Sequence, residues 1–345
     1  MRFRLAALLV VLLGVPALAT PAGAPLFHLS GRWPVAGTEG WDALTADGQA
    51  RRLYITHGSR VDVLDLDHGA LVASIDSTQG SHQVALARDL GRGYVSCGRD
   101  SSVVIFDLAT AKVLQRVALP ARGPDAILYE PTTRRVLVFC GGSSSAVVLE
   151  GATGAIAGAI TLGGRPEFAV TDGAGKVFVN LEDKSEIAEL DPRTLQVLAR
   201  WPLAPGEGPT GIALDRAHHR LFAACSNRTL VVLDAAKGRV VATLPIGDRV
   251  DGIVFDPKRW LACSANGEGT ITVVREVTPR KFEVAETDST QLGARTITID
   301  ETHGTLYTVT ASFGPPPEPT PDRPHPRGPI LPGTFQVLVL EPPAR

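Results

Sequence analysis

The chain has 345 residues, with 34 Lys or Arg against 36 Asp or Glu and a formal net charge of −2. This balance argues against nucleic-acid binding through overall charge, and an aromatic content of 6% is low for a base-stacking platform. The length suits one large all-β domain or two ordinary domains.

The first residues have the three parts of a secretory signal peptide. Arg2 and Arg4 give a positive start, an apolar stretch follows, and Ala17–Ala19 offers a small-x-small cleavage site. An uncleaved anchor is the alternative, but about 15 apolar residues fall short of the roughly 20 that span a bilayer. The sequence therefore predicts a signal peptide over 1–19 and a mature domain over 20–345. The mature product is expected to be periplasmic or secreted, without a membrane span.

One short pattern recurs seven times along the rest of the chain. Each copy has an aromatic or aliphatic anchor at the start of an apolar strand, and successive anchors lie 39 to 46 residues apart. The anchors are Tyr54, Tyr94, Leu137, Phe178, Phe222, Leu261 and Tyr307. A repeat of this length is typical of one propeller blade per copy.

Each copy reads as four short strands of β-branched and aliphatic residues, separated by turn residues. In the fifth copy these strands are "TGIALD", "RLFAACS", "TLVVLD" and "RVVATLPI". An acid usually ends the third strand, where it is expected to cap the N–H groups of the following turn. These acids are Asp65, Asp107, Glu150, Asp191 and Asp234.

The seventh copy ends after its third strand, and the N-terminal segment Leu26–Val35 has the pattern of the missing fourth strand. We predict that this segment pairs beside 334–342 and closes the ring, because closure removes exposed sheet edges. The predicted fold is therefore an all-β, seven-bladed β-propeller of four-stranded blades, closed by an N-terminal strand that completes the last blade.

The copy "RLFAACSNRTLVVLDAAKGRVVATLPIGDRVDGIVFD" resembles the YVTN-type propeller repeat. Over roughly 26–342 the chain resembles the exported bacterial YncE-like proteins of that family. The resemblance implies a propeller but says little about activity, since such relatives include surface-layer proteins, quinoprotein-associated subunits and sugar-lactone hydrolases. The charged turn "LEDKSE" and a long insertion in the last copy depart from the family pattern.

The cysteines are predicted to be buried free thiols, although an even number in an exported chain also allows disulfides. Three of them occupy equivalent positions in separate copies of the repeat, where a small apolar side chain is expected. The four cysteines are Cys97, Cys140, Cys225 and Cys263.

The first strands of the seven copies are expected to begin at one mouth of the central channel, on the face formed by the blade connections. These strands are otherwise small and apolar. Polar groups at one depth of an apolar funnel are typical of a ligand-binding site, and a merely hydrated channel mouth is the alternative. The candidate ligand-binding residues are Asp42, His82, Asp125, Glu167, Thr210, Asp251 and Arg295.

A single histidine among carboxylates suits Ca²⁺ or Mn²⁺ better than Zn²⁺ or Cu²⁺, so a divalent cation is the one cofactor that the pattern suggests. Glu167, Asp125 and Asp251 are the candidate metal ligands, and His82 is the candidate base. The remaining histidines receive no chemical role. His57 is expected beside Arg60 on the same face, and solvated histidines are expected on the opposite side: His68, His218, His219 and His303.

A proline-rich insertion over 311–333 interrupts the last copy between its second and third strands. So many prolines are expected to stay out of a sheet and to form an extended or flexible loop on the channel-mouth face. The loop either covers the mouth, offers Arg323, His325 and Arg327 to a partner protein, or is a plain surface loop.

The sequence leaves two functions open. The first is an exported, non-enzymatic scaffold that binds a protein, a small molecule or a polyanion at the funnel face. The second is a divalent-metal-dependent hydrolase of a lactone or sugar derivative. No H-E-x-x-H, G-x-S-x-G or Walker motif occurs, which favours binding over catalysis. Nucleic acid is the least favoured partner.

Overall fold

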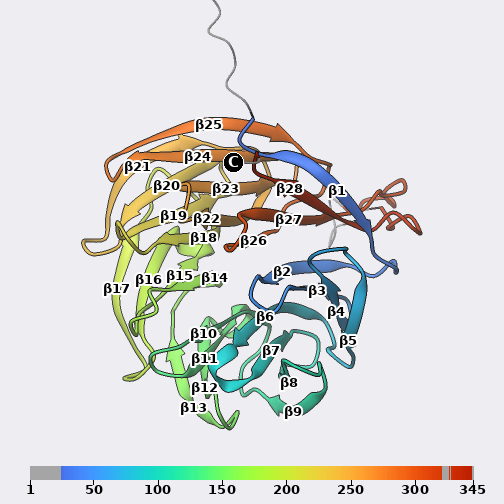
Figure 1. Ribbon diagram of the computed structural model, residues 1–345. Coiled ribbons are helices and arrows are strands. Elements are labelled where there is room, and N and C mark those ends of the chain that lie inside the picture. Colours follow the sequence, from blue (N-terminus) through green and yellow to red (C-terminus); the bar gives the residue numbers. More distant parts are fainter. Residues whose placement is uncertain (1–24, 321–325, 327, 344–345) are drawn as a thin grey trace, which may run out of the picture.

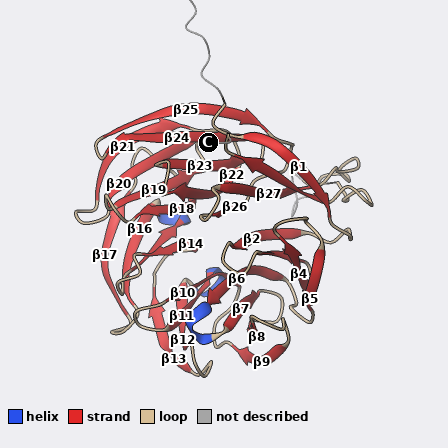
Figure 2. Cartoon of the chain, viewed as in Figure 1, coloured by secondary structure: helices blue, strands red, loops and turns tan. Residues whose placement is uncertain are grey.

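Seven four-stranded antiparallel sheets surround a central channel in the computed structural model, which describes residues 25–320, 326 and 328–343 (Figure 1). The chain is therefore a seven-bladed β-propeller, as the repeat predicted. The expected signal peptide over 1–19 lies outside the described residues. Among the described residues, the helical elements are three short 3₁₀ turns between strands (Figure 2): η1 (Arg88–Leu90), η2 (Gly141–Ser143) and η3 (Glu182–Lys184).

In blades 1 to 6 the four strands are hydrogen-bonded in chain order. Blade 1 consists of β2 (Trp41–Asp47), β3 (Arg52–His57), β4 (Arg60–Asp65) and β5 (Leu71–Ile75). Blade 2 consists of β6 (Ser81–Ala87), β7 (Arg92–Cys97), β8 (Ser102–Asp107) and β9 (Val113–Ala118). Blade 3 consists of β10 (Pro124–Glu130), β11 (Arg135–Cys140), β12 (Ser145–Glu150) and β13 (Ile156–Thr161).

The second half of the ring repeats this arrangement. Blade 4 consists of β14 (Pro166–Thr171), β15 (Val177–Leu181), β16 (Glu186–Asp191) and β17 (Gln196–Pro202). Blade 5 consists of β18 (Pro209–Asp215), β19 (Arg220–Cys225), β20 (Thr229–Asp234) and β21 (Arg239–Pro245). Blade 6 consists of β22 (Val250–Asp256), β23 (Leu261–Asn266), β24 (Thr270–Thr278) and β25 (Lys281–Ser289). Blade 7 consists of β26 (Ile297–Asp300), β27 (Thr305–Thr310), β28 (Gln336–Glu341) and β1 (His28–Pro34).

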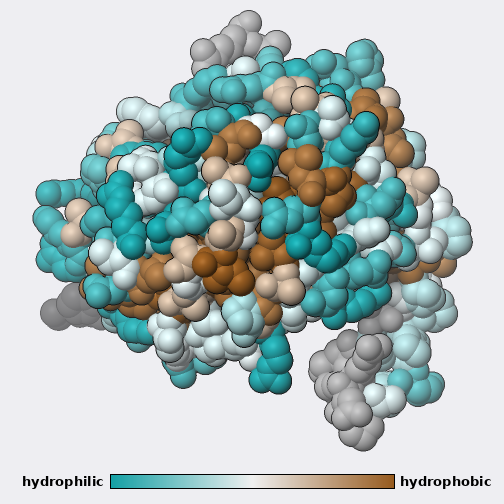
Figure 3. All heavy atoms as spheres, turned by 90° about the horizontal axis from the view of Figure 1, so that it is seen from below, coloured by the Kyte–Doolittle hydropathy of each residue, from teal (hydrophilic) through white to brown (hydrophobic). Residues whose placement is uncertain are grey.

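The hydrophobic core lies between neighbouring blades, because each sheet packs both of its faces against another sheet. The middle strands are therefore continuous apolar runs, and all six residues of β19 are buried. Phe222 of blade 5, for example, stacks on Phe255 of blade 6 with ring centroids 5.3 Å apart. The outermost strands have one exposed face, so β17 alternates between exposed and half-buried residues. The edge view of Figure 3 shows hydrophobic groups gathered between hydrophilic ones on this outer surface.

The ring is closed by the N-terminal strand. β1 lies antiparallel to β28, with His28 opposite Glu341 and Pro34 opposite Gln336, and Val35 N donates to Phe335 O at 2.9 Å. Figure 1 shows this blue strand lying along the red C-terminal strand. The predicted pairing of the two chain ends is thus confirmed, and it gives blade 7 the same four strands as the others.

The turn acids and the cysteines mostly follow the repeat. Asp65, Asp107, Asp191 and Asp234 accept hydrogen bonds from backbone N–H groups of the following turns. Glu150 differs: its carboxylate lies 2.9 Å from the guanidinium of Arg135. The cysteines are buried free thiols, as expected: Cys97, Cys140, Cys225 and Cys263.

The proline-rich insertion is more ordered at its base than the sequence suggested. Phe313 and Ile330 form an antiparallel bridge, and Gly314 N donates to Pro329 O at 2.8 Å. The prolines do not prevent this ribbon, because its donors come from residues that keep an N–H group. Phe313 also lies against Trp41 of β2, with ring centroids 5.9 Å apart, so the base of the loop is packed beside the channel mouth.

Candidate functional site

The candidate ligand-binding residues form a ring of side chains at the channel mouth. A β-bulge near the start of each of six innermost strands sets the level at which these side chains lie in the channel. In blade 1, Trp41 pairs with His57 and Leu44 with Ile55, so Asp42 and Ala43 together face one residue of β3. The same one-residue excess occurs in β6, β10, β14, β18 and β22. A bulge bends the strand and re-aims a side chain. Because the bulge recurs at one repeat position, it places the six side chains at a common level.

Polar residues of the second strands hold several of these bulges, and the sequence analysis missed them. The Thr56 hydroxyl bonds the carbonyls of Ala43 and His82, each at 3.0 Å. The Ser96 hydroxyl donates to Asp125 O in the next blade. Asn180 Nδ2 donates to Thr210 O at 2.9 Å.

The signal for these residues was present in the repeat. Thr56, Ser96 and Asn180 each stand two residues after the anchor, and each is a polar residue in an otherwise apolar strand. Each is also buried and opposes the bulge of its own blade. Buried polar side chains need partners, and here the partners are backbone carbonyls of the ring residues in the next blade.

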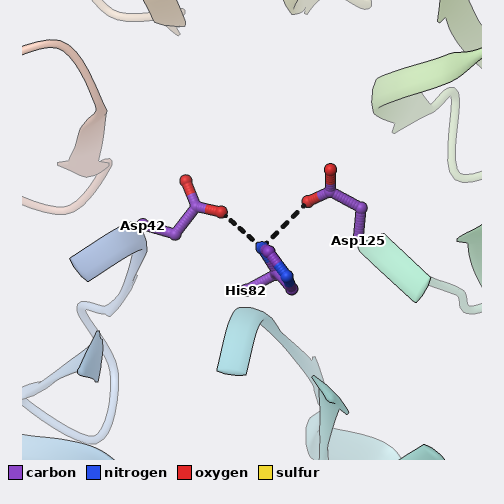
Figure 4. Close-up of side chains that lie close together, drawn as sticks. All are labelled: Asp42, His82 and Asp125. Carbon is purple, nitrogen blue, oxygen red and sulfur yellow. Dashed lines mark hydrogen bonds and ion pairs between the residues drawn. The ribbon is translucent and has the colours of Figure 1, made fainter. Parts of the chain in front are cut away.

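The tightest group in the ring is formed by Asp42, His82 and Asp125, from the first strands of blades 1, 2 and 3. His82 Nδ1 lies 2.7 Å from Asp42 Oδ2 and 3.4 Å from Asp125 Oδ1. Figure 4 shows the imidazole between the two carboxylates, both of which approach the same ring nitrogen. One oxygen or nitrogen from each of the three residues lies within 4.8 Å of the others, a spacing that suits a metal ion.

Of the remaining candidate residues, Asp251 and Arg295 form a second group, and Glu167 and Thr210 each make a separate contact. Arg295 Nε lies 2.8 Å from Asp251 Oδ2, and Arg295 Nη2 lies 3.8 Å from Asp42 Oδ1. Glu167 lies 3.3 Å from the guanidinium of Arg165. The Thr210 hydroxyl donates to Val250 O at 3.2 Å, in the neighbouring blade. The structure thus groups Asp42, rather than Glu167 or Asp251, with His82 and Asp125.

Burial and neighbouring negative charge raise the pKa of two carboxyl groups at the mouth, those of Glu167 and Asp125. Burial, together with the charges of Asp125, Glu182 and Asp251, raises the pKa of Glu167 to about 8. Burial and the Asp42 carboxylate raise the pKa of Asp125 more than His82 lowers it.

The pKa of His82 is raised as well, although for a different reason. Burial alone would lower the pKa of His82, but the hydrogen bond to Asp42 and the charges of Asp125, Asp42 and Glu167 outweigh it and raise that pKa. A proton on His82 is therefore stabilised by the surrounding negative charge, as a bound cation would be.

Below the ring, the central channel encloses a cavity of about 400 Å³. Leu86, Leu128, Phe168 and Val254 are among the apolar residues that line it. Two arginines, Arg88 and Arg216, line its other part. Both follow the ends of their first strands, so they lie at the end of the channel away from the mouth, where Arg88 contacts Asp47 at 3.0 Å. A ligand that enters at the mouth meets polar groups first and apolar walls behind them.

A second hollow of about 440 Å³ adjoins the mouth beneath the base of the proline-rich loop. Arg249 and Arg295 lie on one side of it, and Leu292, Phe313 and Pro316 supply apolar walls. Arg295 belongs both to this hollow and to the ring. The candidate partner-binding residues Arg323, His325 and Arg327 lie outside the described residues.

The other histidines differ in their burial and in the residues that they contact. His57 is buried, bonds Asp62 at 2.8 Å and packs on Phe335, so it presents no free ring at the mouth. The expected solvent exposure holds for His68, whose side chain is 83% exposed, and for His219. His303 is also exposed but contacts Asp300.

His218 does not fit the prediction of a solvated histidine. Only 23% of its side chain is exposed, and its Nδ1 lies 2.7 Å from Asp215 Oδ2 and 2.9 Å from Glu276 Oε1. Glu276 comes from another blade, so no local sequence pattern revealed this contact.

Comparison with known proteins supports the fold and goes no further. No protein-family model matches the chain, and no curated protein matches it. A chain in the crystal structure of a mitotic checkpoint complex aligns with a TM-score of 0.74 and 11% identity, over 97% of this chain and 98% of that chain. In all, 1840 solved chains match, so the likeness supports the fold and leaves the ligand open.

Propellers commonly serve as scaffolds for binding, and many mediate protein interactions. Among the described residues there is no helix with the length and apolar character needed to cross a bilayer.

Proposed function

We propose that this chain is a binding scaffold whose channel mouth receives a positively charged group. The observation that carries the proposal is the charge of the ring, where carboxylates outnumber cationic side chains at one depth of the channel. The carboxylates are Asp42, Asp125, Glu167 and Asp251, and the cationic partners are Arg165, Arg295 and protonated His82.

The electrostatics explain why a cation would bind there. Glu167 and Asp125 hold protons to higher pH than ordinary carboxyl groups, because burial and like charges disfavour their ionised forms. An added positive charge would relieve this repulsion and stabilise the ionised ring. A polyanion would add to this repulsion, so the mouth favours a small organic amine, a divalent cation or a Lys side chain of a partner protein.

The space around the ring supports a small ligand or an inserted side chain. The cavity of about 400 Å³ below the mouth lies within the usual size range of small-molecule sites. The apolar hollow beneath Phe313 offers room for an uncharged part of the same ligand. This arrangement combines a few charged groups with apolar walls, as binding sites commonly do.

The decisive experiment is a thermal-shift and calorimetric titration with mono- and diamines, Ca²⁺ and Mn²⁺. A compound that binds only the folded chain raises the unfolding temperature in a concentration-dependent way. We expect at least one amine or cation to do so, with affinity at least tenfold weaker in Asp125→Asn. Asp248→Asn is the matched control, because Asp248 is a half-buried acid at a blade connection, is not one of the mouth residues and contacts Arg228. Absence of binding, or equal losses in both variants, would refute the proposal.

Metal-dependent hydrolysis of a lactone or sugar derivative is the second candidate. It is favoured by the spacing of Asp42, His82 and Asp125, which would hold the ion. A bound cation would polarise the lactone carbonyl, water would add to that carbon, and the ring C–O bond would break to give a hydroxy acid. The surrounding negative charge raises the pKa of His82, so a proton competes with the ion for its ring nitrogen, which places this candidate second. Chelator-sensitive acid release from an aldonolactone would support it.

We also propose that the product is exported and related to the YVTN-type, YncE-like propellers. The support is the repeat pattern and the signal-like N-terminus. Mass spectrometry of protein recovered from the periplasm or medium tests this directly. A mature chain that begins near residue 20 is expected, whereas full-length protein retained inside the cell would contradict export.

A further inference from the structure

A second cluster of charged side chains lies on the propeller face opposite the channel mouth, between blades 5 and 6. Asp215 ends β18, His218 follows in the next turn, and Glu276 lies in β24. His218 Nδ1 is 2.7 Å from Asp215 Oδ2 and 2.9 Å from Glu276 Oε1. The donor atoms of the three residues all lie within 4.8 Å of one another.

Comparison among the blades shows why this cluster is unusual. In several blades an acid ends the first strand, and a cationic side chain satisfies it. Asp47 contacts Arg88 at 3.0 Å, and Asp256 contacts Arg259 at 2.7 Å. Asp215 has the same repeat position and contacts His218 at 2.7 Å, but a second carboxylate, that of Glu276, lies 2.9 Å from the same imidazole nitrogen.

Blade 7 offers the nearest match to blade 5. Asp300 also contacts the histidine three residues later, His303, at 2.8 Å. There the third group is the guanidinium of Arg51, 2.5 Å from Asp300. The two blades thus share an Asp–His pair and differ in the charge of the residue that faces it.

Glu276 has no adequate partner in the described residues. Its side chain is fully buried, and neither carboxylate oxygen accepts a hydrogen bond from them, although Oε1 lies close to His218. The nearby Arg220 is directed elsewhere: its Nε donates to Pro279 O at 2.8 Å and its Nη1 to His219 O at 3.0 Å. Two facing buried carboxylates are unfavourable unless a positive charge lies between them, because a buried charge needs a compensating one.

We propose that Asp215, His218 and Glu276 form a divalent-cation site that links blades 5 and 6, with Zn²⁺ or Mn²⁺ as the ion. Two carboxylates and one imidazole are a donor set used by these ions, and three protein ligands leave coordination positions for water. The partly exposed His218 ring gives the ion a route to the two buried acids. The proposal does not depend on the channel mouth.

The chemistry of binding follows from the donor atoms. A nitrogen and an oxygen on one ion lie roughly 3.4 Å apart when each bond is about 2.1 Å long, so the imidazole would swing slightly outward on binding. Any proton on His218 Nδ1 or on Glu276 would leave as the ion enters. Because these protons must leave, binding should tighten as pH rises.

The test uses the full chain with Asp42→Asn and Asp125→Asn, so that the ring does not add a second binding event. After removal of metals, the protein is titrated with Zn²⁺ and with Mn²⁺ by calorimetry, and metal content is measured after desalting. We expect one ion per chain, with affinity at least tenfold weaker in Glu276→Gln and in His218→Ala. His303→Ala is the matched control and should leave affinity unchanged.

Two further measurements separate an ion site from a proton-sharing cluster. Pulsed electron paramagnetic resonance of bound Mn²⁺ should show nitrogen coupling that disappears in His218→Ala. Without metal, Glu276→Gln should unfold at a temperature no lower than the parent, since it removes one of two facing buried charges. No binding at millimolar ion, full affinity in Glu276→Gln, or a markedly less stable metal-free Glu276→Gln would overturn the proposal.

Discussion

The hydroxyl of Thr56, in blade 1, lies 3.0 Å from the backbone carbonyl of His82, in blade 2, and the same distance from that of Ala43. One buried side chain thus holds two strand bulges in register across a blade boundary. Ser96 does the same for Asp125 in the next blade. The positions of His82 and Asp125 are therefore set partly by the preceding blade.

Replacement of Thr56 by Val should weaken both the fold and the site. Valine fills nearly the same volume but leaves the carbonyls of Ala43 and His82 without their donor, at a cost of about 1–3 kcal/mol. Denaturant unfolding measures this loss, and titration with the best ring ligand should show weaker binding. Thr243→Val, on the exposed face of β21, is the control and should change neither quantity.

Stability should fall as pH rises through the range in which the ring ionises. Glu167 has a folded pKa of about 8 against an ordinary value of 4.5, so the folded state binds its proton more tightly. Its contribution is complete below the ordinary pKa and is lost as pH rises toward 8. The raised pKa of His82 acts in the same direction.

Glu167→Gln should reduce the fall in unfolding free energy between pH 5 and 8, by about 3 kcal/mol at most. Unfolding free energies measured at several pH values, in the presence of a chelator, give the profile. An unchanged slope in the variant would show that Glu167 ionises normally in the folded chain.

Removal of the Arg295 charge should strengthen cation binding at the ring. Arg295 lies 2.8 Å from Asp251 and 3.8 Å from Asp42, so it offsets part of the negative charge that a ligand would meet. Arg295→Gln is expected to tighten binding of a cationic ligand roughly threefold to tenfold, since these groups are partly exposed and screened. Calorimetry compares the two affinities, and weaker binding in the variant would mean that Arg295 itself contacts the ligand.

Deletion of β1 should destabilise the whole ring. A chain that begins at Val35 lacks the strand that pairs with β28, which leaves a sheet edge open and blade 7 incomplete. We expect a large fall in unfolding temperature and aggregation on storage. A chain that begins at Pro25 retains β1 and should match the mature protein in both respects.

The four cysteines should be unreactive in the folded chain. They are buried, and burial raises the pKa of the Cys97 thiol to about 11 and of the Cys140 and Cys225 thiols to about 12. Ellman's reagent should therefore detect no thiol in native protein and four in guanidinium chloride. Fewer than four after unfolding would reveal a disulfide.

The repeat by itself determined the architecture of this protein. Seven anchors at a nearly constant spacing, and the missing last strand, predicted seven blades and their closure by the N-terminal segment, because strand pattern and turn chemistry are local properties. The positions of Asp42, His82 and Asp125 within their copies of the repeat also placed them at one end of their first strands.

Tertiary structure alone decided which side chains meet. Asp251 and Arg295 lie in adjacent blades yet 44 positions apart, and their contact depends on the curvature of the ring. His218 was expected in solvent because its turn resembles other surface turns. Its contact with Glu276 arises from the packing of blade 6 against blade 5. The repeat pattern does not predict this contact, because Glu276 does not belong to that pattern. The strands and blades follow from the repeat pattern. Both candidate sites, in contrast, depend on individual side chains that differ from one copy of the repeat to the next.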